Sequence, residues 1–135
     1  MIRKLEKPKK TVSKKTLRNK ADKLLQEIGR IVYGDKGCLV CEGEYSCLHH
    51  FKYKSQSTAL RYDLENCIPI CASCHHKIHN GRDDFVAARI GIIMGDDWIR
   101  RLEEKKRDGA GKYYGVGFYK QKVEELTEIL SMLKL

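Results

Sequence analysis

The chain of 135 residues has no long apolar run. Its longest apolar stretches, such as Ile90 to Met94, are far shorter than the roughly 20 residues that a membrane-spanning helix needs. The basic N-terminus is not followed by the apolar segment that a secretory signal requires. From these two absences we expect no membrane partner and a cytoplasmic location.

Acidic residues are nearly missing from residues 1–20, which hold nine lysines or arginines and a single acid, Glu6. The rest of the chain is almost balanced, with eighteen basic and seventeen acidic residues. A concentrated basic segment is typical of proteins that bind a phosphate backbone, although charge alone fits a solvated tail equally well. We expect residues 1–13 to form a basic flexible arm. The candidate phosphate contacts in and beside this arm are Lys9, Lys10, Lys14 and Lys15.

The middle of the chain has the pattern of short strands. Two strands are expected at about 45–49 and 67–70, on either side of an exposed loop from Phe51 to Tyr62. Pro69 would place the second strand at the edge of a sheet, because proline cannot donate a ladder hydrogen bond. We see no internal repeats, and the glycines near residue 111 do not match a phosphate-binding fingerprint.

Helical patterns account for the other segments. The expected helices run from Ser13, as N-cap, to Tyr33; from 74 to 80, closed by Gly81; from 85 to 91, capped by Asp83 or Asp84; from 96 to 106, capped by Asp96 or Asp97; and from 118 to 133. The last of them has an apolar stripe, which predicts core packing, with a dimer seam as the lesser option. This stripe comprises Val123, Leu126, Leu130 and Leu133.

Four of the six cysteines form two C-x2-C pairs. Zinc prefers four thiolates in a tetrahedron, and each C-x2-C turn supplies two of them. Since the chain has no export signal, zinc is favoured over disulfides. The predicted ligands of this structural zinc are Cys38, Cys41, Cys71 and Cys74. Cys47 and Cys67 fall outside the pairs, and we expect them to be small, buried apolar residues.

The histidines cluster near the cysteines. His75 and His79 are one helical turn apart and can therefore bind one metal together. His49 and His50 are neighbours, and neighbours on a strand point to opposite faces, so both can serve one site only where the chain leaves the strand. His76 lies about 100° around the helix and is expected at the surface. On residue type alone, these histidines could equally be structural or alternative zinc ligands.

The order His49-His50, Asn66 and Cys71-x2-Cys74-His75 resembles the motif of the HNH (ββα-metal) endonucleases. The cysteine pairs are similar to those of the zinc-containing branch, which includes phage endonuclease VII. The pairs, the interval from His50 to Asn66 and the preceding Lys-rich arm and helix resemble the NinG/Rap family of phage recombination endonucleases. The resemblance implies an α+β fold with a small ββα-metal (HNH/His-Me finger) core and a four-cysteine zinc knot, flanked by an N-terminal helix and two or three C-terminal helices.

The length of the chain predicts one compact domain, and the patterns above together with the resemblance divide it into four parts. Residues 1–13 would be the basic arm and residues 14–34 the N-terminal helix. Residues 35–82 would form the zinc-bound HNH core, and residues 83–135 the C-terminal helical region.

By position, the resemblance makes His50 the general base and Asn66 the residue whose amide braces the loop that carries the base. It makes His49 and His75 ligands of a catalytic metal, and His79 matches an extra helix histidine of colicin-type members. Many members have Asp and Asn at the positions of His49 and His75. Oxygen ligands suit Mg²⁺, whereas three imidazoles accommodate Zn²⁺, Ni²⁺ or Mn²⁺ more readily. The identity of the second metal is therefore open among these four ions.

The implied activity is metal-dependent hydrolysis of DNA phosphodiester bonds. The NinG/Rap likeness points to branched recombination intermediates, such as D-loops and Holliday junctions, in a bacterial cell or phage-infected host. Lys52, Lys54 and Arg61 lie in the loop beside the site and are candidates to hold phosphates, although simple solvation fits these side chains equally well. Cutting two strands of a junction favours a homodimer. Two alternatives remain: an HNH nicking enzyme of homing or packaging type, and a non-catalytic zinc-bound DNA-binding module.

Overall fold

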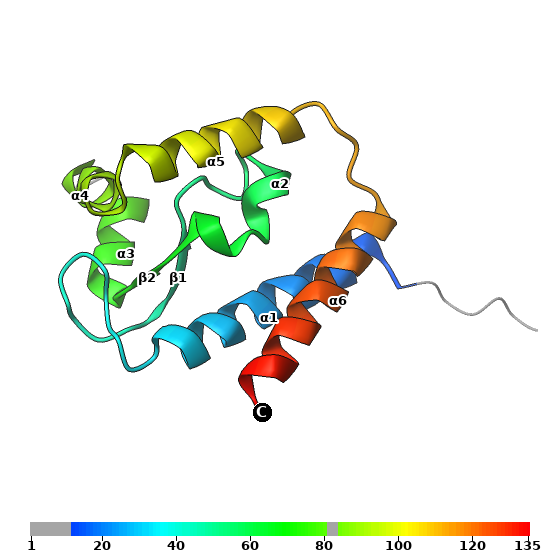
Figure 1. Ribbon diagram of the computed structural model, residues 1–135, viewed down its shortest axis with the longest axis horizontal. Coiled ribbons are helices and arrows are strands. Elements are labelled where there is room, and N and C mark those ends of the chain that lie inside the picture. Colours follow the sequence, from blue (N-terminus) through cyan, green and yellow to red (C-terminus); the bar gives the residue numbers. More distant parts are fainter. Residues whose placement is uncertain (1–11, 81–83) are drawn as a thin grey trace, which may run out of the picture.

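The computed structural model describes residues 12–80 and 84–135, and it has the α+β architecture that the sequence predicts. The elements are α1 (Lys14–Tyr33), β1 (Cys47–His50), α2 (Thr58–Arg61), the 3₁₀ turn η1 (Leu64–Asn66), β2 (Cys67–Ile70), α3 (Ala72–His79), α4 (Asp84–Met94), α5 (Asp96–Gly109) and α6 (Val116–Leu133). Most of the predicted arm, with Lys9 and Lys10, lies outside the described residues, as do Gly81 and Asp83. In Figure 1 the two strands lie between α1 and α5.

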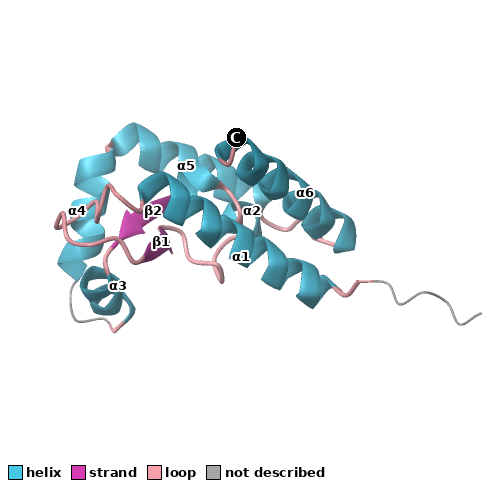
Figure 2. Ribbon diagram, turned by 90° about the horizontal axis from the view of Figure 1, so that it is seen from below, coloured by secondary structure: helices cyan, strands magenta, loops and turns pink. Residues whose placement is uncertain are grey.

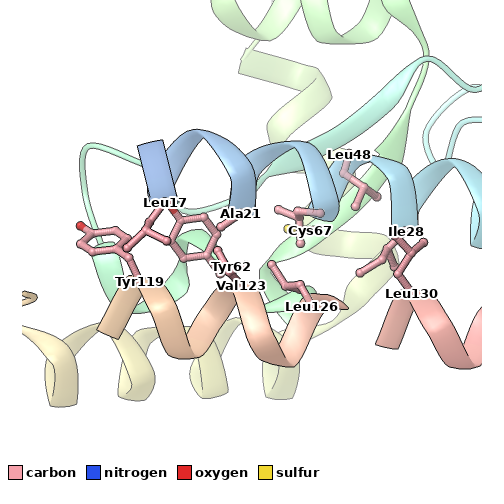
Figure 3. Close-up of a cluster of buried hydrophobic side chains, with 11 residues drawn as sticks. Leu17, Ala21, Ile28, Leu48, Tyr62, Cys67, Tyr119, Val123, Leu126 and Leu130 are labelled. Atoms are coloured by element: carbon pink, nitrogen blue, oxygen red, sulfur yellow. The ribbon is translucent and has the colours of Figure 1, made fainter. Parts of the chain in front are cut away.

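The N-terminal helix begins where the sequence predicts, because Ser13 Oγ accepts the N–H of Thr16 at 3.2 Å. Its apolar face packs against α6, and Figure 3 shows side chains of the two helices interleaved with Leu48, Tyr62 and Cys67. The buried residues of this interface are Leu17, Ala21, Leu25 and Ile28 from α1, and Tyr119, Val123, Leu126 and Leu130 from α6. Core packing of the final stripe is thus confirmed. Leu133 is the exception: it ends α6 and is 39% exposed.

The two strands form an antiparallel pair in which His49 lies opposite Ile68 and His50 opposite Cys67. β1 starts at Cys47 rather than near residue 45, since its pairing ends opposite Ile70, where the chain turns into α3. The side-chain amide of Gln26 on α1 accepts from the N–H of Leu48 at 2.9 Å and donates to its carbonyl at 3.1 Å.

On the other edge of the sheet, the carbonyl of Pro69 accepts the N–H of Leu39 at 3.0 Å. Both strands of a two-stranded sheet are edge strands, which agrees with the expected position of the proline. The central residue on the outer edge of each strand is therefore hydrogen-bonded to a neighbouring segment: Leu48 to α1, and Pro69 to the segment before β1.

The loop between the strands is exposed only in part, so the prediction of an exposed segment from Phe51 to Tyr62 is wrong for its second half. Residues 53–56 are exposed, but Ser57, Leu60 and Tyr62 are buried. Ser57 caps α2 by accepting the N–H of Leu60 at 3.2 Å, and the short helix contacts α5. A local cap thus folds this part of the loop against the core.

Helices α4 and α5 cover the other side of the strands, where they pack against Ile68 and Ile70. The N-cap of α5 is Gly95, whose φ of +91° favours glycine, so Asp96 and Asp97 occupy the first turn and are not the cap as predicted. Trp98 anchors this helix by donating to the carbonyl of Glu65 at 2.8 Å. Figure 2 shows α3 and α4 at the same end of the molecule as the strands. None of the helices in the described ranges is long and apolar enough to cross a membrane.

Candidate active site and metal centres

The four paired cysteines come together at one end of the hairpin. Cys38 and Cys41 precede β1, and Cys71 and Cys74 lie at the start of α3. Their sulfur atoms all lie within 4.8 Å of one another, and the Sγ atoms of Cys41 and Cys71 are 3.5 Å apart. Tetrahedral zinc with bonds of about 2.3 Å needs sulfurs about 3.8 Å apart, so the set fits zinc. All six cysteines of the chain are free of disulfides.

The electrostatics of these thiols also fit a bound cation. Desolvation opposes ionisation of Cys71, but the N–H of Cys74 and the neighbouring thiols lower its pKa to about 7. Burial and the adjacent sulfurs raise the pKa of Cys74. The thiolate of Cys71 therefore forms readily while Cys74 resists ionisation, and a divalent cation supplies the positive charge that four adjacent thiolates require.

A second group of metal-binding side chains is formed by His49 of β1 with His75 and His79 of α3. One ring nitrogen from each lies within 4.8 Å of the others, and the Nε2 atoms of His75 and His79 are 2.8 Å apart. Burial and the two neighbouring imidazoles lower the pKa of His49 to about 3, so its ring is neutral at pH 7. Neutral imidazoles are the ligand form that divalent metals bind.

His50 ends β1 and faces the same cavity as the metal-binding histidines. Its Nε2 lies 2.8 Å from the carbonyl oxygen of Arg61. A carbonyl can only accept, so Nε2 carries the hydrogen and Nδ1 carries the lone pair. Burial lowers the pKa of His50 below its ordinary value of 6.5. The residue is thus a neutral imidazole with a fixed tautomer.

The histidines meet in a cavity of about 520 Å³. Its lining comprises Gln26, Cys47, Leu48, His49, His50, Tyr53, Lys54, Ser55, His75 and His79. Adjacent strand residues reach one cavity here because the chain leaves β1 directly after His50. His76, on the same helix as two of the ligands, is exposed as predicted.

Asn66 is fully buried and lies outside the cavity lining. Its Oδ1 accepts the N–H of Lys52 at 2.8 Å, and its Nδ2 donates to the carbonyls of Lys52 at 2.9 Å and Leu60 at 3.2 Å. The amide therefore ties the turn that follows His50 to the end of α2.

Two residues of α1 support this arrangement, and sequence reasoning missed both. Gln26 bonds to the backbone of Leu48, directly before the histidine pair. Asp22, one turn earlier, accepts from Nε of Arg61 at 3.0 Å and from its Nη2 at 2.6 Å. The only sequence signal is a pair of polar residues four apart beside an apolar stripe, which many surface helices share.

Cys47 was also missed, because it was expected to be a buried apolar residue. It is half-buried, lines the cavity, and places Sγ 3.6 Å from Nδ1 of His75. The other nitrogen of that ring faces His79. Burial raises the pKa of Cys47, which keeps it a thiol. Cys67, in contrast, is buried as predicted.

The predicted phosphate contacts lie in different surroundings. Lys52 is paired with Glu103, and Arg61 with Asp22. Lys54 is exposed and lines the cavity. Of the two helix lysines, Lys14 lies over the rings of Tyr113 and Tyr119, and Lys15 is exposed.

A short antiparallel hairpin followed by a helix, with strand-end and helix histidines around one cavity, defines the ββα-metal class of fold. Residues 38–81, about a third of the chain, match the family model described as HNH endonuclease. The matched segment contains both metal-binding groups and supports nuclease activity and DNA binding in general terms. Comparisons with curated proteins and with solved structures returned no match.

Proposed function

We propose that this protein is a metal-dependent endonuclease that hydrolyses DNA phosphodiester bonds at the histidine cavity. One observation carries the proposal: the three-histidine group and a fourth, tautomer-fixed histidine line the same cavity within the segment that matches the HNH model. A structural zinc site alone would not need these four imidazoles.

The roles follow from the chemistry of each side chain. His50 is the general base, because its neutral ring can accept a proton from water through Nδ1. His49, His75 and His79 would hold a divalent metal, which supplies positive charge for the scissile phosphate and the leaving oxygen. Three imidazoles suit Zn²⁺, Ni²⁺ or Mn²⁺ more readily than Mg²⁺. Asn66 fixes the turn after the base and thereby its orientation.

The four cysteines would hold a structural zinc, which joins the segment before β1 to the start of α3. We further propose the division into arm, N-terminal helix, zinc-bound core (35–82) and C-terminal helical region. The helical parts then serve as a scaffold for the core, since α1 contacts both β1 and Arg61.

The finer proposal is a preference for branched recombination DNA in a phage or prophage setting, and it rests on the NinG/Rap resemblance. A junction-cutting enzyme must act on two strands, which favours a homodimer. The apolar stripe of α6 is covered by α1, so a dimer would have to use another surface. Sedimentation of the protein as a monomer only, with and without DNA, would remove the dimer.

The decisive experiment is plasmid nicking by purified protein with Mg²⁺, Mn²⁺, Ni²⁺ or Zn²⁺ and with EDTA. We expect nicking with at least one ion and none with EDTA. His50→Ala should slow nicking by about 10²–10⁴-fold, the usual contribution of a general base. His76→Ala is the matched control, because His76 is exposed and bonded to Asn80; it should cut at the wild-type rate.

The outcomes separate the alternatives. Equal rates for His50→Ala and wild type would show that another residue is the base. DNA binding without cleavage under every ion would favour the non-catalytic module. A panel of linear duplex, single strand, flap and four-way junction tests the finer proposal, and equal cutting of plain duplex would favour a general nicking enzyme.

A further inference from the structure

The outer face of α1 is basic and lies beside the histidine cavity. The helix carries six lysines or arginines and two acids. Both acids are already in ion pairs, Asp22 with Arg61 and Glu27 with Lys134. The basic side chains of the helix are therefore not neutralised by the acids of the same helix. Gln26 is the side chain through which α1 reaches the cavity.

Lys23 and Arg30 flank this glutamine. Lys23 precedes Gln26 by three residues and Arg30 follows it by four, which places them about 60° and 40° around the helix from it. Both side chains are exposed, and within residues 12–80 and 84–135 neither is in an ion pair. At 1.5 Å per residue they are about 10 Å apart along the helix axis.

Lys54 supplies a third cation, on the wall of the cavity itself. It is also exposed and has no ion-pair partner in the described part of the chain. The other loop cations differ, because Lys52 and Arg61 are each held by an acid. Lys54 thus lines the cavity, and Lys23 and Arg30 lie on either side of the one α1 residue that lines it, Gln26.

We propose that Lys23 and Arg30, together with Lys54, bind backbone phosphates of a DNA strand on either side of the phosphate that enters the histidine cavity. Each strand of a duplex advances about 3.4 Å per phosphate, so a separation of about 10 Å spans about three phosphate steps. A strand that runs along α1 meets both cations, with the cavity between them. Such contacts set the position of the backbone without reading its sequence. The inference rests on the proposed function only in taking this cavity as the place of cleavage.

The test is the salt dependence of binding to a fluorescent DNA duplex without added divalent metal, between about 50 and 200 mM salt. Lys23→Gln and Arg30→Gln should each lower the slope of log K against log salt by about 0.9, and the double variant by about 1.8. Lys20→Gln is the matched control, since it removes the same charge from an exposed site on the same helix, about 120° from Gln26. It should leave the slope at the wild-type value.

Cleavage gives a second readout. The double variant should lose kcat/KM several-fold while its single-turnover rate at saturating protein stays at the wild-type value, because the cations bind DNA and take no part in the chemistry. A wild-type slope in the double variant, or an equal loss in Lys20→Gln, would overturn the proposal. Failure of the wild-type protein to cleave would count against the proposed function alone, because the binding slopes are read without cleavage.

Discussion

His50 donates through Nε2 to the backbone carbonyl of Arg61 at 2.8 Å, and the guanidinium of the same arginine is held by both oxygens of Asp22. Asp22 of α1 lies outside the segment that matches the HNH model, and it supports the candidate base indirectly, by holding the residue to which His50 donates. This chain of contacts fixes which ring nitrogen carries the lone pair, and it can be broken without touching the base itself.

Asp22→Asn should weaken this support. Loss of a charged partner from a mostly buried pair is expected to cost about 1–3 kcal/mol of unfolding free energy. The single-turnover cleavage rate should fall roughly tenfold, which corresponds to about 1.4 kcal/mol of barrier. Asp97→Asn is the control, because Asp97 pairs with Arg100 at the surface, where the two side chains are 78% and 68% exposed respectively. Removing this ion pair should cost less than about 1 kcal/mol of unfolding free energy. Unchanged cleavage in Asp22→Asn would show that the ion pair is not needed to orient His50.

Cleavage should depend on pH through His50. Burial lowers the pKa of this imidazole below 6.5, so the neutral form that can accept a proton predominates at pH 7 and above. Protonation removes the base, and the rate should fall only as the pH drops below about 6.5. Single-turnover rates at saturating metal, from about pH 5 to pH 8, give the profile. A rate that keeps rising well above pH 7 would point to a different base.

Cys71→Ser should remove the structural zinc. A bound zinc contributes its binding free energy to folding, so the variant should lose zinc by atomic absorption and lose several kcal/mol of unfolding free energy in urea. Cys67→Ala is the matched control, because this buried thiol lies outside the cysteine group and contacts the carbonyl of Asp63. It should keep its zinc and lose about 1–2 kcal/mol. Full zinc content in Cys71→Ser would contradict the four-cysteine site.

Cys47→Ala should weaken metal binding at the histidines. Groups that contact the second nitrogen of a ligating imidazole orient it, and their loss typically costs about 10–100-fold in metal affinity. Here the thiol lies 3.6 Å from Nδ1 of His75. Titration with Co²⁺, followed by its absorption spectrum after the cysteine site is filled with zinc, measures the affinity. Cys67→Ala should bind Co²⁺ like wild type, and an equally tight Cys47→Ala would exclude this role.

The features that the sequence predicted well are those encoded by short spacings. Two C-x2-C turns and histidines one helical turn apart determine their own geometry locally, and the structure brings each set together. The buried face of α6 could be predicted for the same reason, since the helical periodicity of its apolar residues alone indicates which face is buried.

The polar contacts that support the site could not be predicted from short spacings in the sequence. Asp22 and Arg61 are 39 residues apart, and Lys52 and Glu103 are 51 apart. Such polar pairs depend on how whole elements pack, and a single lysine or aspartate gives no periodic signal of its partner. The contact between Cys47 and His75 likewise depends on the register of β1 against the segment that leads into α3.

The glutamine that bonds to Leu48 has one more consequence. A hairpin of two four-residue strands would normally present unpaired backbone to solvent, where a strand from another chain could add to it. On the outer edge of β1, the side chain of Gln26 is bonded to both the backbone N–H and the carbonyl of Leu48. On the outer edge of β2, Pro69 has no N–H, and its carbonyl accepts the N–H of Leu39. The two-stranded sheet is thereby closed at its centre to strand addition, which protects it against edge-to-edge aggregation.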